Sequence, residues 1–276
     1  MNDLPPSDSA DARRTQAPNP LTDLLYKSLV IAEMDVRKLR HDFTELLTRA
    51  IQPMLWLLLF GEVMARSRTI PTGGMDYLDF LAPGILAQSV LFVAIFYGID
   101  VIWERDMGVL YKLLASPTPR TALVLGKALA VGARALSQLL VVFMLSALLG
   151  VGVSHDPLAL LGLVAVAWIG AALFSTFSLI IACIVKTRER FMGIGQVLTM
   201  PLFFASNAIY PIAMMPAWLQ AVAHANPLSY QVDALRALML ADGHSSFGLG
   251  LDFAVLLTVT ALLIAVAARM YPRLAI

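Results

Sequence analysis

Long apolar runs separated by short charged segments dominate the pattern of this chain. An α-helix rises about 1.5 Å per residue, so a run of roughly twenty apolar residues matches the ~30 Å hydrocarbon core of a bilayer. Six such runs predict an all-α integral membrane protein with one six-span domain over residues 46–273. The predicted spans are 46–65, 80–102, 135–153 on a helix that starts near Arg120, 158–185, 191–207 and 247–268.

Two segments precede the predicted spans. Residues 1–20 are rich in Pro, Ser and Asp and hold no apolar run, which predicts a disordered tail and not a signal peptide. Over residues 21–45, apolar side chains recur every three or four positions between basic and acidic ones. This spacing predicts an amphipathic helix that lies in the membrane interface with its basic side toward the lipid headgroups.

The composition excludes an ordinary soluble domain. Apolar residues make up 59% and charged residues 14% of the 276 positions, and the mean hydropathy is +0.76. If both termini are cytoplasmic, seventeen of the 20 Lys and Arg residues fall on the cytoplasmic side, in agreement with the positive-inside rule. The only cysteine, Cys183, lies in an apolar run and is expected to be buried and inert.

The stretch from Trp103 to Lys127 interrupts the apolar pattern between the second and third spans. It begins with charges and continues with leucines at helical spacing, and two prolines then end the helix. We interpret it as a short cytoplasmic helix on the membrane surface that another protein contacts. The residues assigned to this contact are Glu104, Arg105, Asp106, Gly108, Leu110, Leu113, Leu114, Ser116 and Pro117.

A second informative stretch covers residues 208–246, where Asn226 and Pro227 give an N-cap followed by proline at the first helical position. The helix predicted from Pro227 to Ala241 is about 22 Å long, which is too short to span. We expect an extracytoplasmic helical hairpin between the fifth and sixth spans that dips into the outer leaflet or lies on it. Structural roles are predicted for Asn226, Pro227, Tyr230, Asp233 and Arg236, the last two as an ion pair.

No motif for catalysis or nucleotide binding is recognisable in the sequence. Gly126-Lys127 is followed by Ala128 and has no glycine five residues before it, so it is not a P-loop. The histidines are scattered over loops and the amphipathic helix, which does not predict a metal site. We therefore expect no enzymatic activity and no metal or cofactor bound by this chain, and transport or scaffolding remains.

Polar and aromatic residues share one face on each of two predicted spans. On the second span these residues are joined by Ile99, and on the fifth they are spaced by four, three and four. A mixed face of this kind suits an amphiphilic solute. The alternative interpretation is ordinary helix packing, with the amides hydrogen-bonded to neighbouring helices. The candidate path residues are Gln88, Phe92, Phe96, Gln196, Met200, Phe203 and Asn207.

The order of these elements resembles the type-2 permeases of ATP-binding cassette (ABC) exporters, in the group that includes daunorubicin-resistance and nodulation-factor export permeases. The resemblance covers about Leu21 to Pro272. One motif runs from Glu104 through Gly108 to Pro117, with Gly126-Lys127 after it. The other is Asn226 to Tyr230, followed by Asp233 and Arg236.

The resemblance implies a permease subunit that moves an amphiphilic drug, lipid or glycan out across the bacterial inner membrane. Its partners would be a second permease copy, membrane lipid and two cytoplasmic ATPase subunits that bind ATP and Mg, with no nucleic acid. The 104–117 helix would sit in a groove of the ATPase and move the second and third spans. A membrane-bound enzyme or assembly scaffold that uses no ATP is the alternative, and it would not need that helix to bind an ATPase.

Overall fold

The computed structural model describes residues 20–39, 51–67, 70–72, 74–115, 118–185 and 187–272. Most of the tail predicted for residues 1–20, the junction of the amphipathic helix with the first span, and Ser116 and Pro117 lie outside these residues. Within them the chain is helical, and its one β-type pairing is the isolated bridge between Val153 and Leu240.

The helices follow the order that the sequence predicts. Residues 51–55 are helical and lead into a π-helical segment, η1. The elements are α1 (Pro20–Leu39), η1 (Trp56–Gly61), α3 (Glu62–Ser67), α4 (Tyr77–Asp106), α5 (Val109–Ala115), α6 (Arg120–Leu148), α7 (Pro157–Ile184), α8 (Arg188–Phe204), η2 (Ile212–Met214), α9 (Ala217–Ala225), α10 (Pro227–Met239) and α11 (Leu249–Met270).

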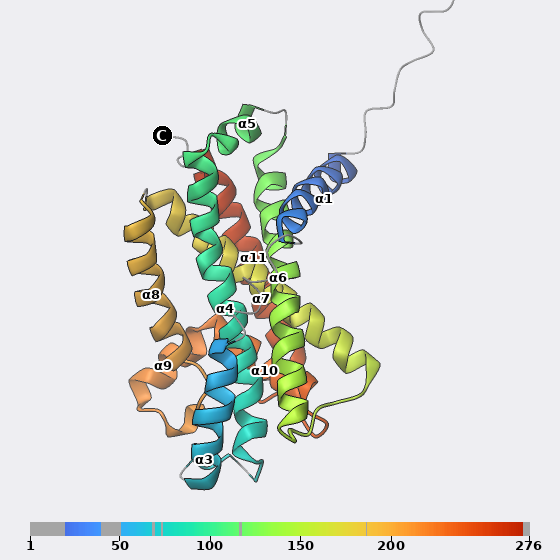
Figure 1. Cartoon of the computed structure of the whole chain (residues 1–276), viewed down its shortest axis with the longest axis vertical. Helices are drawn as coiled ribbons and strands as arrows, with labels where there is room; N and C mark the ends of the chain where they lie inside the picture. The colour runs from blue at the N-terminus through green and yellow to red at the C-terminus, as the bar shows by residue number, and fades with distance from the viewer. Residues whose placement is uncertain are drawn as a thin grey trace, which may run out of the picture.

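The long helices run between two opposite ends of the molecule (Figure 1). The short helix α5 lies at one end, beside the last turn of α4 and the first turn of α6, and we name this the α5 end. The loop after α3 and the turn between α6 and α7 lie at the other end, and α9 and α10 occupy the same half of the molecule. We name that the hairpin end.

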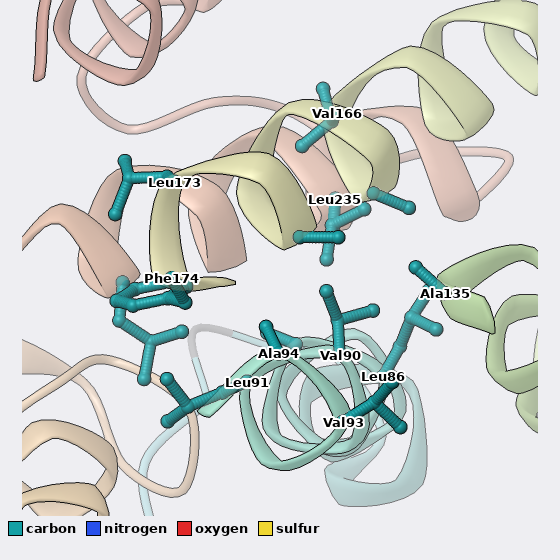
Figure 2. Packing of buried hydrophobic residues seen from close by; sticks show 14 of the residues in the cluster. Leu86, Val90, Leu91, Val93, Ala94, Ala135, Val166, Leu173, Phe174 and Leu235 are labelled. Carbon is teal, nitrogen blue, oxygen red and sulfur yellow. The ribbon is translucent and has the colours of Figure 1, made fainter. Parts of the chain in front are cut away.

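Helix α4 is the centre of the core. Its residues Leu86, Val90 and Ala94 are fully enclosed, and they face Val166 of α7 and Leu235 of α10 (Figure 2). Helix α4 carries buried apolar side chains on all of its faces, which is the pattern of a helix enclosed within a bundle. Helix α4 packs against α6, α7, α8 and α10 and therefore holds these helices in one bundle.

Four of the described helices, α4, α6, α7 and α11, are long and apolar enough to cross a membrane. Helix α8 has 17 residues, which is about 25 Å. The described part of the first predicted span, 46–65, is residues 51–65. The chain is thus a membrane protein with several apolar helices.

One expectation about helix ends is changed by the structure. Glu104, Arg105 and Asp106 form the last turn of α4 and not the start of the short helix, which begins only at Val109. Gly108 separates the two helices with a φ of 74°, a left-handed conformation that glycine adopts without steric cost. The expectation that the third helix begins near Arg120 is confirmed.

Helix α10 does not lie on the surface of the protein. Nine of its residues, from Leu228 to Met239, are buried, and the helix packs between α4, α7 and α11. Asn226 holds its start through the N-cap that the sequence predicts and through bonds to α8 that it does not predict. Cys183 is buried, as the sequence predicts.

Candidate functional site

Two buried charges join α4 to α6 at the α5 end. Lys127 Nζ donates to Glu104 Oε2 at 2.5 Å, and the side chains are only 3% and 8% exposed. Removing one partner of such a buried pair leaves an uncompensated charge, which costs about 3–5 kcal/mol. The pair therefore fixes the last turn of α4 to α6.

A second ion pair lies further along the same two helices. Arg134 Nη1 donates to Asp100 Oδ2 at 2.7 Å. The ring of Tyr97 contacts both cations, with its centroid 5.7 Å from Lys127 Nζ and 5.3 Å from Arg134 Cζ. Lys127 and Arg134 of the apolar helix α6 are thus both paired with carboxylates of α4, and the two helices are held together at two levels.

The last residue of α4 is also tied to α8. Asp106 accepts hydrogen bonds from Arg105 at 2.8 Å and from Arg188, the first residue of α8, at 2.7 Å. The Arg188 guanidinium also stacks over the Trp103 ring, with 3.6 Å between Cζ and the ring centroid. Three helices, α4, α6 and α8, are therefore joined at the end that carries α5.

Exposed apolar side chains occur at this charged end. Trp103, Met107 and Tyr111 are 46%, 64% and 52% exposed. Arg105, Asp106 and Lys112 lie among them in the sequence, so this surface carries apolar and charged groups together. Such a surface is typical of a contact with another protein. We name Trp103, Met107 and Tyr111 the α5 surface.

The residues predicted to contact a partner fall into three groups. The first group is partly accessible and comprises Arg105, Asp106, Gly108 and Leu113. Glu104 and Leu110 are buried within the chain, so they act on a partner only through their neighbours. The Leu114 side chain, Ser116 and Pro117 lie outside the described part of the chain. The sequence-based prediction missed the α5 surface because it gave weight to leucines at helical spacing and not to the larger side chains before and between them.

A cavity of about 420 Å³ opens between residues 51–55, α4 and α6. The predicted face of the second span lines it, because Gln88, Phe92 and Phe96 all point there together with Ile99. The rings of Phe92 and Phe96 stack with centroids 6.0 Å apart. Gln138 of α6 lines the opposite wall, and its Nε2 is buried without a hydrogen-bond partner. We name this the α4 cavity.

The second predicted face is divided. Gln196 and Met200 are exposed on α8, whereas Phe203 is buried with its ring 6.0 Å from that of Trp56. Asn207 lies beyond the end of α8 and lines a separate cavity at the hairpin end. None of the four residues lines the α4 cavity, so the two predicted faces do not meet within one chain.

Asn226 ties the hairpin to α8. Its Oδ1 accepts from the Leu228 amide at 3.0 Å and so caps α10. Its Nδ2 donates to the carbonyls of Leu202 at 2.7 Å and Ala205 at 3.0 Å, at the end of α8. One side chain therefore satisfies free backbone groups at two helix ends, and Pro227 follows it at the first helical position.

Asp233 and Arg236 do not form the predicted ion pair. Asp233 Oδ2 accepts from the Ser245 hydroxyl and from the Phe247 amide, each at 2.9 Å. Arg236 Nη2 instead donates to two carbonyls, and its guanidinium lies 4.0 Å from the Phe80 ring centroid. The expectation was wrong because Asp233 is bound by the α10–α11 loop, whereas Arg236 is bound by carbonyls of α4 and of the loop after α8.

Comparison with known proteins identifies the family of this chain. The family described as "ABC-2 type transporter" matches residues 26–240. The chain therefore belongs to the ABC-2 transporter permease family. Membership implies an ABC ATPase as partner, and permease components of this kind are not themselves enzymes.

Relatives within the family cover much of the chain. The ycf38 protein of Pyropia yezoensis is 31% identical over 199 residues, which is 70% of this chain and 67% of the relative. The daunorubicin resistance ABC transporter permease protein DrrB1 of Streptomyces coeruleorubidus is 28% identical over 243 residues, 85% of this chain and 81% of the relative. Nodulation protein J of Sinorhizobium fredii is 26% identical over 169 residues, 60% of this chain and 63% of the relative.

Proposed function

We propose that this chain is the membrane subunit of an ATP-driven exporter in the inner membrane of a bacterium. It has six spans and two cytoplasmic termini, and it works as a pair of identical copies with two ATPase subunits that bind ATP and Mg. The observation that carries this proposal is the α5 end, where an exposed apolar surface adjoins three ion-paired helices.

Coupling requires that a push on the α5 surface reaches the membrane spans without being absorbed locally. Trp103 and Met107 lie at the junction of α4 and α5, within four residues of the buried Glu104. Because Glu104 is paired with Lys127 on α6, a displacement of this junction moves α4 and α6 as one body. The contact between Arg188 and Asp106 carries the same displacement to α8.

The α4 cavity suits the cargo. Stacked aromatic rings form its apolar wall, and Gln88 and Gln138 supply amides that can bond the polar part of a solute. An amphiphilic drug, lipid or glycan fits this combination. Relatives named for daunorubicin resistance and for nodulation support an amphiphilic cargo.

A second copy of the chain completes the pathway. The exposed face of α8 carries Gln196, Met200 and Val197, and the helical residues near Trp56 also expose apolar side chains. Pairing of two chains along these faces would bring Gln196 and Met200 toward the α4 cavities. The hairpin of α9 and α10 then limits backflow at the outer side.

Purification of the chain with its ATPase tests this proposal. Tyr111→Ala removes an exposed aromatic ring from the α5 surface, and we expect it to reduce cargo-stimulated ATPase activity and recovery of the ATPase. Trp218→Ala removes another exposed aromatic ring, from α9, and this matched control should change neither. Equal effects of the two variants, or a permease that purifies without any ATPase in mild detergent, would contradict the proposed coupling.

A further inference from the structure

A second cavity, of about 430 Å³, lies at the hairpin end. Residues from five parts of the chain build its wall: the start of α4, the loop after α8, α9, α10 and the loop before α11. We name it the hairpin cavity. The residues that matter here are Phe80, Asn207, Ile212, Arg236, Ser246 and Phe247.

The hairpin cavity contains a buried cation. Arg236 is only 5% exposed, and burial lowers its pKa to about 10, so it still carries its charge at pH 7. Its Nη2 donates to the carbonyls of Phe80 at 3.2 Å and Asn207 at 2.8 Å. Its Nε is buried and has no hydrogen-bond partner.

No carboxylate contacts this guanidinium in the part of the chain that the structure describes. Asp233 is one turn away on the same helix, but its Oδ2 is directed to Ser245 and Phe247. Asp233 therefore supports the positive charge through space and does not neutralise it by contact. The Phe80 ring, 4.0 Å from the guanidinium, and the distant Asp233 stabilise the charge, but neither gives it the directly bonded anion that a buried cation usually has.

The remaining wall defines what could bind beside the cation. Ile212 and Phe247 give an apolar surface, and Asn207 Oδ1 is a buried acceptor without a donor. A ligand that suits the cation, the Asn207 acceptor and the apolar surface has an anionic head, a hydroxyl or amide donor and an apolar body. The α4 cavity differs, because the charged residue among its described lining is an anion, Asp100.

We propose that the hairpin cavity is a subsite for an anionic amphiphile, in which Arg236 binds a carboxylate or phosphate headgroup and Ile212 and Phe247 hold the apolar part. The assignment of this cavity as a binding site for exported cargo rests on the proposed function. It narrows the cargo class from amphiphiles in general to amphiphiles with an anionic group.

Photolabelling of the full chain in a neutral detergent tests this assignment. The probes are a diazirine-bearing dodecanoic acid and its methyl ester, which differ only in the charge of the headgroup. We expect the acid to label peptides that contain Phe80 or Phe247 about tenfold more strongly than the ester does. A tenfold ratio corresponds to ~1.4 kcal/mol of binding free energy, and a charge-assisted hydrogen bond from Arg236 to the carboxylate supplies this difference. Equal labelling by the two probes would overturn the proposal.

Variants separate charge from folding. Ser246 is an exposed residue of the cavity wall, so Ser246→Asp adds a negative charge there without disturbing the core, and Ser246→Asn is its neutral counterpart. Ser246→Asp should weaken labelling by the acid at least threefold and leave the ester unchanged, whereas Ser246→Asn should change neither. Arg236→Gln, which keeps a donor for the carbonyls, should remove the preference for the acid. If the preference survives in both Arg236→Gln and Ser246→Asp, the subsite does not exist.

Two further comparisons show whether the anion is a lipid headgroup, and whether a negative result contradicts the subsite or the proposed exporter. Phosphatidylglycerol in a nanodisc should abolish labelling if the occupant is a lipid headgroup, and labelling that persists identifies an amphiphile that is not a bilayer lipid. Labelling needs no ATPase, whereas the proposed coupling is measured only with it. A charge preference without ATPase coupling would therefore defeat the exporter and leave the subsite, and the reverse result would defeat the subsite alone.

Discussion

Gly126 and Lys127 attach α6 to two different helices. Lys127 reaches across to Glu104 of α4 and forms a buried ion pair at 2.5 Å. Gly126 faces α1, where an added Cβ would lie 2.7 Å from the carbonyl oxygen of Ser28. One dipeptide therefore fixes α6 against the amphipathic helix on one side and against the helix that leads into α5 on the other.

The buried pair predicts a strong asymmetry between single and double substitutions. Lys127→Met leaves the Glu104 carboxylate buried without its counterion, and Glu104→Gln leaves the Lys127 ammonium in the same state. Each should lower stability by about 3–5 kcal/mol, whereas the double variant should recover most of that loss. Thermal unfolding of the purified variants in detergent measures both effects.

The exposed pair of Arg37 and Glu33 on α1 provides the control, since its side chains are 75% and 61% exposed. Its loss should change stability by less than about 1 kcal/mol. If Lys127→Met were as mild as Arg37→Met, the buried pair would not brace α4 against α6.

Gly126→Ala is expected to displace α1. The new methyl group would lie 2.7 Å from both the Ser28 carbonyl oxygen and the Ile31 Cβ, and backbone atoms of a helix cannot give way as a flexible side chain can. Faster hydrogen exchange of the α1 amides should report the displacement. Gly193→Ala on α8 meets nothing within 4 Å and should leave exchange unchanged, so identical behaviour of the two variants would argue against close packing of α1 on α6.

Much of the helical framework could be predicted from local patterns, because span length, N-caps and proline positions are encoded within a few residues. The start of α6 at Arg120, the capped start of α10 at Asn226, and the face of Gln88, Phe92 and Phe96 were all accessible in this way. Local patterns failed where the partner is remote. Glu104 looked like a surface charge because its counterion is 23 residues away.

The same limit explains the hairpin. Spacing of three residues on one helix suggested that Asp233 and Arg236 pair, but their partners come from the loop before α11 and from α4. These contacts depend on how α10 inserts between other helices, which no short window of sequence contains. The division of the α8 face has the same origin, since only the bundle decides which of its residues are covered.

Asn226 should be more important than an ordinary N-cap. Asn226→Ser keeps an acceptor for the Leu228 amide but loses the two bonds donated to Leu202 and Ala205. Asn226→Ala loses all three. We expect a loss of about 1–3 kcal/mol for Ser and a larger loss for Ala, because the carbonyls at the end of α8 are left without their donor.

Thermal unfolding measures these losses, and the difference between the two variants isolates the cap. Asp156 provides a comparison, since it caps α7 through a single bond to the Leu158 amide. Asp156→Ala should cost only about 1 kcal/mol. If Asn226→Ser were no worse than Asp156→Ala, the link between the hairpin and α8 would contribute nothing measurable.

The orientation of the chain predicts that its two ends react from opposite sides of the membrane. Helix α4, with 30 residues, separates them by about 45 Å, which exceeds the thickness of the hydrocarbon core.

Cysteine is best placed at exposed positions, Tyr111 on α5 and His244 in the loop before α11, in a chain whose buried Cys183 is replaced by alanine. Gly243 is less suitable, because a side chain there would approach the Arg236 carbonyl oxygen. In intact cells a membrane-impermeant maleimide should label His244→Cys at once and Tyr111→Cys only after the membrane is opened. The α5 end and the hairpin end lie at opposite ends of the long helices, so the reverse labelling pattern would mean an inverted topology. The α5 surface would then be beyond the reach of a cytoplasmic ATPase. Labelling of both cysteines from outside would contradict the assignment of α4 as a span.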